Sequence, residues 1–137
     1  MRALALDYGA ARCGVALSDP TGTLATPLDA VVRPDSDTGV GAIADLVRDR
    51  GVEAVVVGLP LTLAGDESAQ TKEARAFAER LRTAVAVPVE LYDERLTTAQ
   101  ARRTGGAASE DSRAAAHLLE AWLAARQARG GTGREGG

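Results

Sequence analysis

The sequence has few aromatic residues, a single cysteine and no long apolar run. Aromatic side chains make up 3% of the 137 residues, so small aliphatic side chains must form most of the core. Cys13 cannot form an internal disulfide, which agrees with a reducing compartment. No segment approaches the roughly 20 apolar residues that cross a bilayer, and the amino terminus has no signal-peptide pattern. We therefore expect a cytoplasmic protein that does not associate with membranes.

An excess of positive charge is also lacking, since 19 acidic residues outnumber 16 Lys and Arg residues and the net charge is -3. This balance argues against indiscriminate binding to nucleic acid, so any such contact must be local. Lys72 is the only lysine, and arginine, the other cation, is suited to bidentate phosphate contacts. The chain is long enough for one domain with a real core and too short for two sizeable lobes.

Apolar segments predict an α/β fold with a mixed sheet flanked by helices. Five strands are expected, three as an antiparallel meander and two parallel, at residues 4–7, 15–17, 25–32, 53–58 and 87–92. Pro27 places the third strand at a sheet edge. Helical spacing predicts helices at residues 38–50, from about 68 to 85, 97–102 and 109–126. Residues 1–127 are then one domain, and the Gly/Arg-rich residues 128–137 a disordered tail.

Three carboxylates stand where the predicted core elements begin or end. Asp7 ends the first strand, Glu94 follows the fifth, and Asp111 lies in the first turn of the last helix, on the face of Ala115 and Leu118. If the first, fourth and fifth strands are neighbours, all three acids meet at one rim of the sheet. Carboxylates crowded in this way repel one another unless a divalent cation neutralises them. Oxygen ligands without histidine or cysteine favour Mg²⁺ or Mn²⁺.

Each of these features also has a simpler structural interpretation. Asp7 could equally cap the turn that follows its strand, and Asp111 could complement the helix dipole. His117 lies six residues past Asp111, so we expect it to point away from Asp111, toward solvent or a local partner.

Arginines close to the acids are candidate ligands for nucleic acid phosphates. Arg12 and Arg95 are adjacent to the acidic positions and could hold phosphates that flank the cleaved bond. Arg102 and Arg103 could extend this track, although simple solvation of the surface explains them equally well.

Three motifs resemble those of the YqgF-like (RuvX) family, within the ribonuclease H-like superfamily. They are Asp7-Tyr8-Gly9 with Arg12 and the following Gly-Val-Ala-Leu-Ser-Asp at 14–19, Val-Gly-Leu-Pro-Leu at 57–61, and Asp-Glu-Arg-Leu-Thr-Thr at 93–98. The resemblance runs nearly end to end and implies a ribonuclease H-like fold. It assigns the acidic positions of the family to Asp7, Glu94 and Asp111. It also implies a metal-dependent nuclease that processes the 5′ end of the 16S ribosomal RNA precursor or resolves Holliday junctions.

The chain departs from the family pattern at its basic positions. Residues 104–110 are short, glycine-rich and nearly uncharged where the family carries a longer Lys/Arg-rich segment, so a contact loop for nucleic acid is reduced. Alanines occupy positions 10 and 11, where Thr and a basic residue are frequent, so the phosphate-facing charge near Asp7 falls mostly to Arg12.

Two other functions are compatible with parts of the sequence. A non-catalytic nucleic acid or ribosome-assembly module that kept the fold would fit the reduced basic loop. Actin-like kinases open their nucleotide-binding lobes with an Asp-x-Gly turn, but they close two lobes around ATP and 137 residues supply one. Within the leading hypothesis, a junction resolvase needs two active sites and hence a homodimer, whereas trimming an RNA end needs one.

Overall fold

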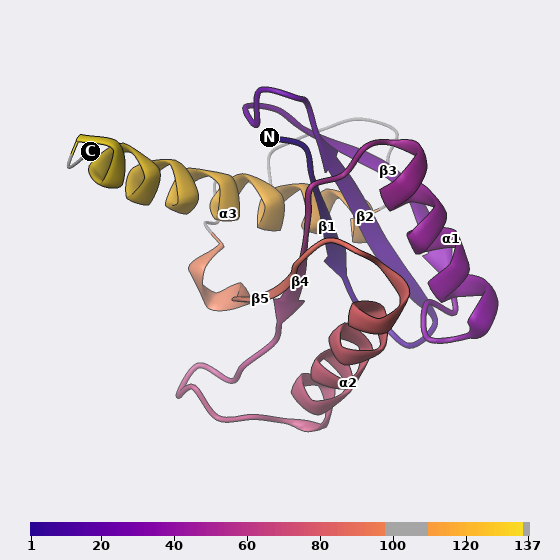
Figure 1. Cartoon of the computed structure of the whole chain (residues 1–137). Helices are drawn as coiled ribbons and strands as arrows, with labels where there is room; N and C mark the ends of the chain where they lie inside the picture. Colours follow the sequence, from indigo (N-terminus) through magenta and orange to yellow (C-terminus); the bar gives the residue numbers. More distant parts are fainter. Residues whose placement is uncertain (98–109, 136–137) are drawn as a thin grey trace.

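The computed structural model describes residues 1–97 and 110–135 (Figure 1). The short helix expected at residues 97–102 therefore falls almost entirely outside the described residues, as do Arg102 and Arg103. None of the described helices is both long and apolar enough to cross a membrane.

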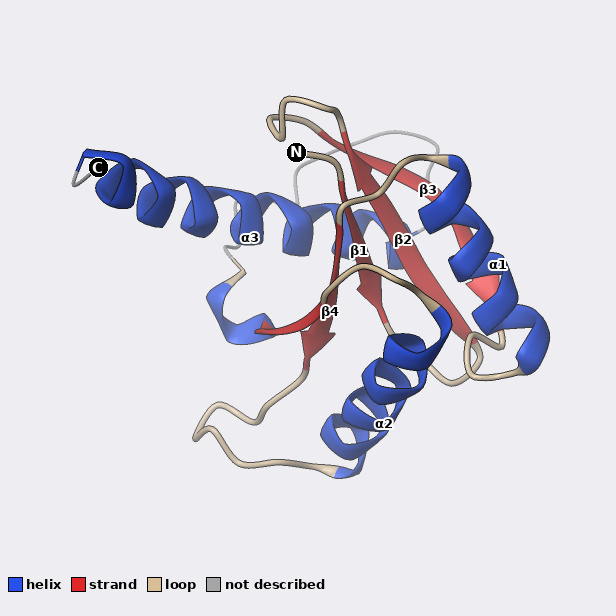
Figure 2. Cartoon of the chain, viewed as in Figure 1, coloured by secondary structure: helices blue, strands red, loops and turns tan. Residues whose placement is uncertain are grey.

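A five-stranded mixed sheet forms the centre of the molecule, in the order β3-β2-β1-β4-β5 (Figure 2). The strands β1, β2 and β3 form an antiparallel meander, and β4 is parallel to both β1 and β5. Their bounds are β1 (Ala3–Asp7), β2 (Arg12–Ser18), β3 (Ala25–Val32), β4 (Ala54–Leu59) and β5 (Val89–Asp93). The sheet predicted from the sequence is confirmed. Strand β3, which carries Pro27, lies at the edge, and every residue of the central strand β4 is buried.

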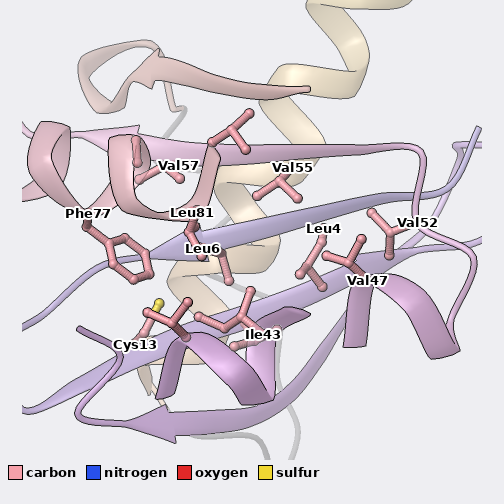
Figure 3. Close-up of a cluster of buried hydrophobic side chains, with 14 of the residues drawn as sticks. Leu4, Leu6, Cys13, Ile43, Val47, Val52, Val55, Val57, Phe77 and Leu81 are labelled. Carbon is pink, nitrogen blue, oxygen red and sulfur yellow. The ribbon is translucent and has the colours of Figure 1, made fainter. Parts of the chain in front are cut away.

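Helices cover both faces of the sheet. Helices α1 (Asp37–Asp49) and α2 (Ala69–Ala84) lie on one face, and α3 (Glu110–Glu135) crosses the other (Figure 1). Side chains of β1 alternate between the two cores, since Leu4 and Leu6 pack with α1 and α2 (Figure 3), whereas Ala3 and Ala5 pack with α3. Alanines on the second face let the backbone of α3 lie close to the strands.

Serine caps fix where the first two helices begin. The Ser36 side chain accepts a hydrogen bond from the Gly39 N–H at the start of α1. Ser68 and Thr71 form a reciprocal capping box at the start of α2, which confirms the start expected near Ser68. A short 3₁₀ helix, η1 (Glu94–Leu96), follows β5 and was not predicted.

Helix α3 is longer than the sequence predicted. It continues past the expected end near Arg126 to Glu135, and two contacts lie close to the expected end. The Arg126 guanidinium lies over the Trp122 ring, 5.4 Å from its centroid. The Gln127 side chain donates a hydrogen bond of 3.3 Å to the Gly22 carbonyl. The division into a domain ending at 127 and a separate tail stays a prediction.

Candidate active site

The carboxyl ends of β1, β4 and β5 meet at one rim of the sheet because these strands are parallel and adjacent. Asp7 is the last residue of β1, and Glu94 opens η1 directly after β5. Their side chains share a hydrogen bond. Gly58 of β4 lies between them, and a Cβ atom at this position would sit 2.4 Å from Glu94 Oε2. The rim thus brings two of the predicted acids into direct contact, and glycine at 58 leaves the space for it.

The surroundings of Asp7 and Glu94 disfavour a negative charge on both carboxyl groups at once. Burial raises the pKa of Asp7, the negative charge of Asp111 raises it further, and the hydrogen bond from Glu94 opposes the shift. Burial, the charge of Asp7 and the hydrogen bond between the two groups raise the pKa of Glu94 to about 7. Near neutral pH the two carboxyl groups therefore share one proton, with protonated Glu94 donating to the Asp7 carboxylate.

Asp111 lies nearby but has another partner. Its carboxylate is 3.6 Å from the Arg12 Nε, and both side chains are about half exposed. Within residues 1–97 and 110–135, no group of three or more His, Cys, Asp or Glu side chains is close enough to hold a metal ion. The structure therefore brings Asp7 and Glu94 together, with Asp111 acting on Asp7 through its charge, and the full three-acid ligand set stays a prediction.

The first turn of α3 is held by contacts that sequence reasoning missed. A Cβ atom at Gly14 would lie 1.9 Å from the Asp111 carbonyl oxygen, so only glycine allows the helix to approach β2 this closely. The pairing of β2 with β3 shifts register between Cys13 and Val15, and the Val15 N–H donates instead to the Ser112 hydroxyl, at 3.2 Å. A glycine inside an apolar strand was the available signal for such a close approach.

Arg95 is tied to its own neighbour in the sequence. Its guanidinium contacts the Asp93 carboxylate through Nε, at 3.0 and 3.1 Å, and through Nη2, at 2.6 Å, and it also donates to the Leu63 carbonyl. The hydrogen bond from Arg95 lowers the pKa of Asp93. Of the adjacent acids Asp93 and Glu94, only Glu94 contacts Asp7. Of the four arginines predicted to bind phosphate, the two that the structure describes, Arg12 and Arg95, thus have carboxylate partners in the free protein.

A cavity of about 510 Å³ opens between the rim and α3. It is lined by Asp7, Glu94, Thr97, Glu110, Arg113, Ala114, His117 and Leu118. Of the two alternatives expected for His117, the solvent-facing one is wrong, and the local one has a partner in Glu120, whose Oε1 lies 3.5 Å from Nδ1. The His117 side chain is buried and lines the same cavity as Asp7 and Glu94. The reason is that positions 110, 113, 114, 117 and 118 form one stripe of α3, and this stripe faces the rim.

Comparison with known proteins decides the family. A family model described as "RuvX: Holliday junction resolvase" matches residues 1–125. The chain belongs to the RuvX family. A relative from Anaeromyxobacter sp. (strain Fw109-5), named "Putative pre-16S rRNA nuclease", is 44% identical over 137 residues, which cover 93% of this chain and 100% of the relative. A relative of the same name from Leifsonia xyli subsp. xyli (strain CTCB07) is 45% identical over 113 residues, covering 80% of this chain and 73% of the relative. RuvX membership confirms the predicted nuclease class, a hydrolase that acts on phosphodiester bonds of nucleic acid.

Solved structures confirm the fold. T. thermophilus RuvC in complex with a Holliday junction substrate superposes with a TM-score of 0.63 at 17% identity, covering 93% of this chain and 96% of that chain. A second T. thermophilus RuvC structure gives a TM-score of 0.57 at 20% identity, covering 93% and 97%. The predicted ribonuclease H-like fold is therefore shown for this RuvX chain.

Proposed function

We propose that this RuvX protein is a metal-dependent nuclease that cuts structured nucleic acid in the cytoplasm, with the 5′ end of precursor 16S rRNA as its main substrate. The observation that carries the proposal is the pair Asp7 and Glu94, which shares one proton at the wall of an open cavity. The names of the curated relatives support the RNA substrate. Resolution of Holliday junctions is the second candidate, supported by the family description, and would require a homodimer with two active sites.

The residues at the rim suit a hard divalent cation. Asp7 and Glu94 present carboxylate oxygens, the ligands that Mg²⁺ and Mn²⁺ prefer. A cation would replace the shared proton and offset both the burial and the neighbouring negative charges that raise the pKa of the two groups. Asp111 would become the third ligand when its carboxylate leaves Arg12. When bound, the cation supplies Lewis-acid stabilisation of the charge that develops at the cleaved phosphate.

The protein's own contribution is to orient the nucleic acid strand through side chains that contact it on either side of the cleaved bond. Because the pKa of Glu94 is about 7, a cation that binds near neutral pH could displace its proton easily. Arg12 would exchange the Asp111 carboxylate for a phosphate that flanks the cleaved bond, and Arg95 would do the same from Asp93. Arg102 and Arg103 would extend this track.

Cleavage assays with three substrates test the proposal. A 5′-extended fragment of precursor 16S rRNA, a four-way DNA junction and ATP are each incubated with the protein in Mn²⁺, in Mg²⁺ and in EDTA. We expect cleavage of the RNA that requires the metal and no turnover of ATP. If either nucleic acid binds but neither Mn²⁺ nor Mg²⁺ supports cleavage, the result would favour the non-catalytic module instead. Turnover of ATP would favour the actin-like hypothesis. Light scattering shows whether any junction cleavage accompanies dimer formation.

A further inference from the structure

His117 is an unusual residue for its position in the helix. It is the only histidine of the chain and is 6% exposed, between the buried residues Ala116 and Leu118. Its Nδ1 atom is buried and has no hydrogen-bond partner among residues 1–97 and 110–135. The nearest acidic atom is Glu120 Oε1, 3.5 Å away on the next turn of α3. A leucine at this position would pack without leaving a buried polar atom unsatisfied, so the histidine lowers the stability of the fold.

His117 lines the cavity at the rim, where a ligand could reach it. His117 lies one helical turn after Arg113 and two after Glu110, and all three line the cavity opposite Asp7 and Glu94. The cavity therefore has two carboxylates on the rim and, on the helix, two nitrogen-bearing side chains beside a third carboxylate, Glu110. Its volume of about 510 Å³ suits one phosphate with its attached nucleoside.

We propose that His117, backed by Glu120, binds a phosphate of the nucleic acid strand that lies in this cavity, opposite Asp7 and Glu94. This inference rests on the proposed nuclease function and extends it to a residue outside the acidic set. Nδ1 lies 3.5 Å from Glu120 Oε1 without a hydrogen bond in the free protein, so a small shift on ligand binding would let Nδ1–H donate to Glu120 and would leave Nε2 for the ligand. With a hydrogen on each nitrogen, the ring bridges the Glu120 carboxylate and a phosphate oxygen. The charged groups that share its surroundings are Glu110, Arg113 and Glu120 on α3 and the two acids of the rim.

Two substitutions separate binding from structure. His117→Leu fills the site with apolar atoms and removes the unsatisfied Nδ1, so thermal stability should stay the same or rise. The same variant loses the phosphate contact, so we expect KM for the 5′-extended RNA to rise about tenfold, with little change in kcat. His117→Gln keeps a side-chain N–H donor and should recover most of the lost affinity. Arg126→Ala is the matched control, because Arg126 lies on the same helix against Trp122 and away from the cavity, and its KM should equal that of wild type.

The outcomes against the proposal are specific. An unchanged KM in His117→Leu would overturn it, and so would a sharp fall in melting temperature, which would show that the ring is structural. Affinity for the same RNA is also measured in EDTA, where no cleavage occurs. If wild type binds but never cleaves in metal, the proposed nuclease function fails, while an affinity loss of about tenfold in His117→Leu would still support the phosphate contact.

Discussion

Glu94 is the residue whose protonation decides the net charge at the rim. The ordinary pKa of a glutamate carboxyl group is 4.5, and burial raises the pKa of Glu94 in the folded protein to about 7. The folded state therefore binds more protons than the unfolded chain between these two values, and the metal-free protein loses stability as pH rises through this window.

We predict that raising the pH from about 4.5 to about 7.5 lowers the free energy of unfolding of the metal-free protein by on the order of 1 to 2 kcal/mol from this group. Water screening of the partly exposed carboxyl makes the loss smaller than the full pKa shift implies. Urea unfolding in EDTA at several pH values measures it. Glu94→Gln should reduce the decline in this interval, and an equally steep decline in that variant would contradict the assignment.

Gly58 gives a test of the space that Glu94 needs. A methyl group at position 58 would lie 2.4 Å from Glu94 Oε2, and a flexible side chain can move away at small cost. We predict that Gly58→Ala lowers metal-dependent cleavage at least about tenfold while changing stability by less than about 1 kcal/mol. Cleavage kinetics and thermal unfolding of the same preparation check both parts. Full activity would show that the observed Glu94 position is not the active one.

Individual site residues were predictable where chain direction alone decides their place. Asp7 and Glu94 follow adjacent parallel strands, and such strands bring their carboxyl ends to one edge. The solvent-facing alternative for His117 was wrong, because spacing along a helix does not show which elements pack against each of its sides. The side of α3 that carries His117 lines the cavity together with Asp7 and Glu94.

At the scale of elements, the docking of α3 on β2 positions Asp111 and the helix side of the cavity. The contact depends on Gly14, which leaves room for the Asp111 carbonyl, and on Ser112, which accepts from the Val15 N–H. Both partners of that hydrogen bond are buried.

We predict that Gly14→Ala destabilises the protein by at least about 2 kcal/mol, because its methyl group would meet backbone that cannot move without displacing the helix. Ser112→Ala should cost about 1 to 3 kcal/mol, since it leaves the buried Val15 N–H without this acceptor. Gly41→Ala is the control, because a Cβ atom there meets nothing within 4 Å. Chemical unfolding measures all three, and a neutral Gly14→Ala would show that α3 is not held against β2.

Strands and helices were predicted well where burial dictates a single period. The apolar run of β4 indicated a central parallel strand, and the residues at helical spacing in α1 and α2 form their buried faces. The register shift in β2 was not predictable, because Val15 there contacts Ser112 of the distant helix α3. The contact of Gln127 with Gly22, just past the predicted end of α3, likewise joins segments far apart in the sequence. The 3₁₀ helix η1 was missed although its contacts are local, with the Asp93 side chain accepting from the Arg95 N–H.

At the scale of the whole molecule, acidic residues slightly outnumber basic ones, and the two described arginines near the rim are paired with carboxylates. The net charge is -3, and Arg12 and Arg95 already contact carboxylates. Each phosphate contact on duplex DNA contributes about -0.9 to the slope of log affinity against log salt.

We therefore predict a shallow slope, of about -2 to -3, for junction DNA bound without metal, and a flatter one after Arg12→Ala. Fluorescence anisotropy across a salt series measures both. A slope near that of six or more contacts would reveal a basic surface assembled from distant arginines or from two copies of the chain.

The central claim is that Asp7 and Glu94 together hold the cation that cleavage of the substrate requires. Its most direct test is Mn²⁺-dependent cleavage by Asp7→Asn and Glu94→Gln, each compared with Asp93→Asn, whose carboxylate faces Arg95. We predict that the first two variants lose at least about a hundredfold in activity while melting at the same or a higher temperature in EDTA, and that Asp93→Asn keeps most of its activity. Equal residual activity in the three variants, or a sharp loss of stability in metal-free Asp7→Asn, would contradict the account.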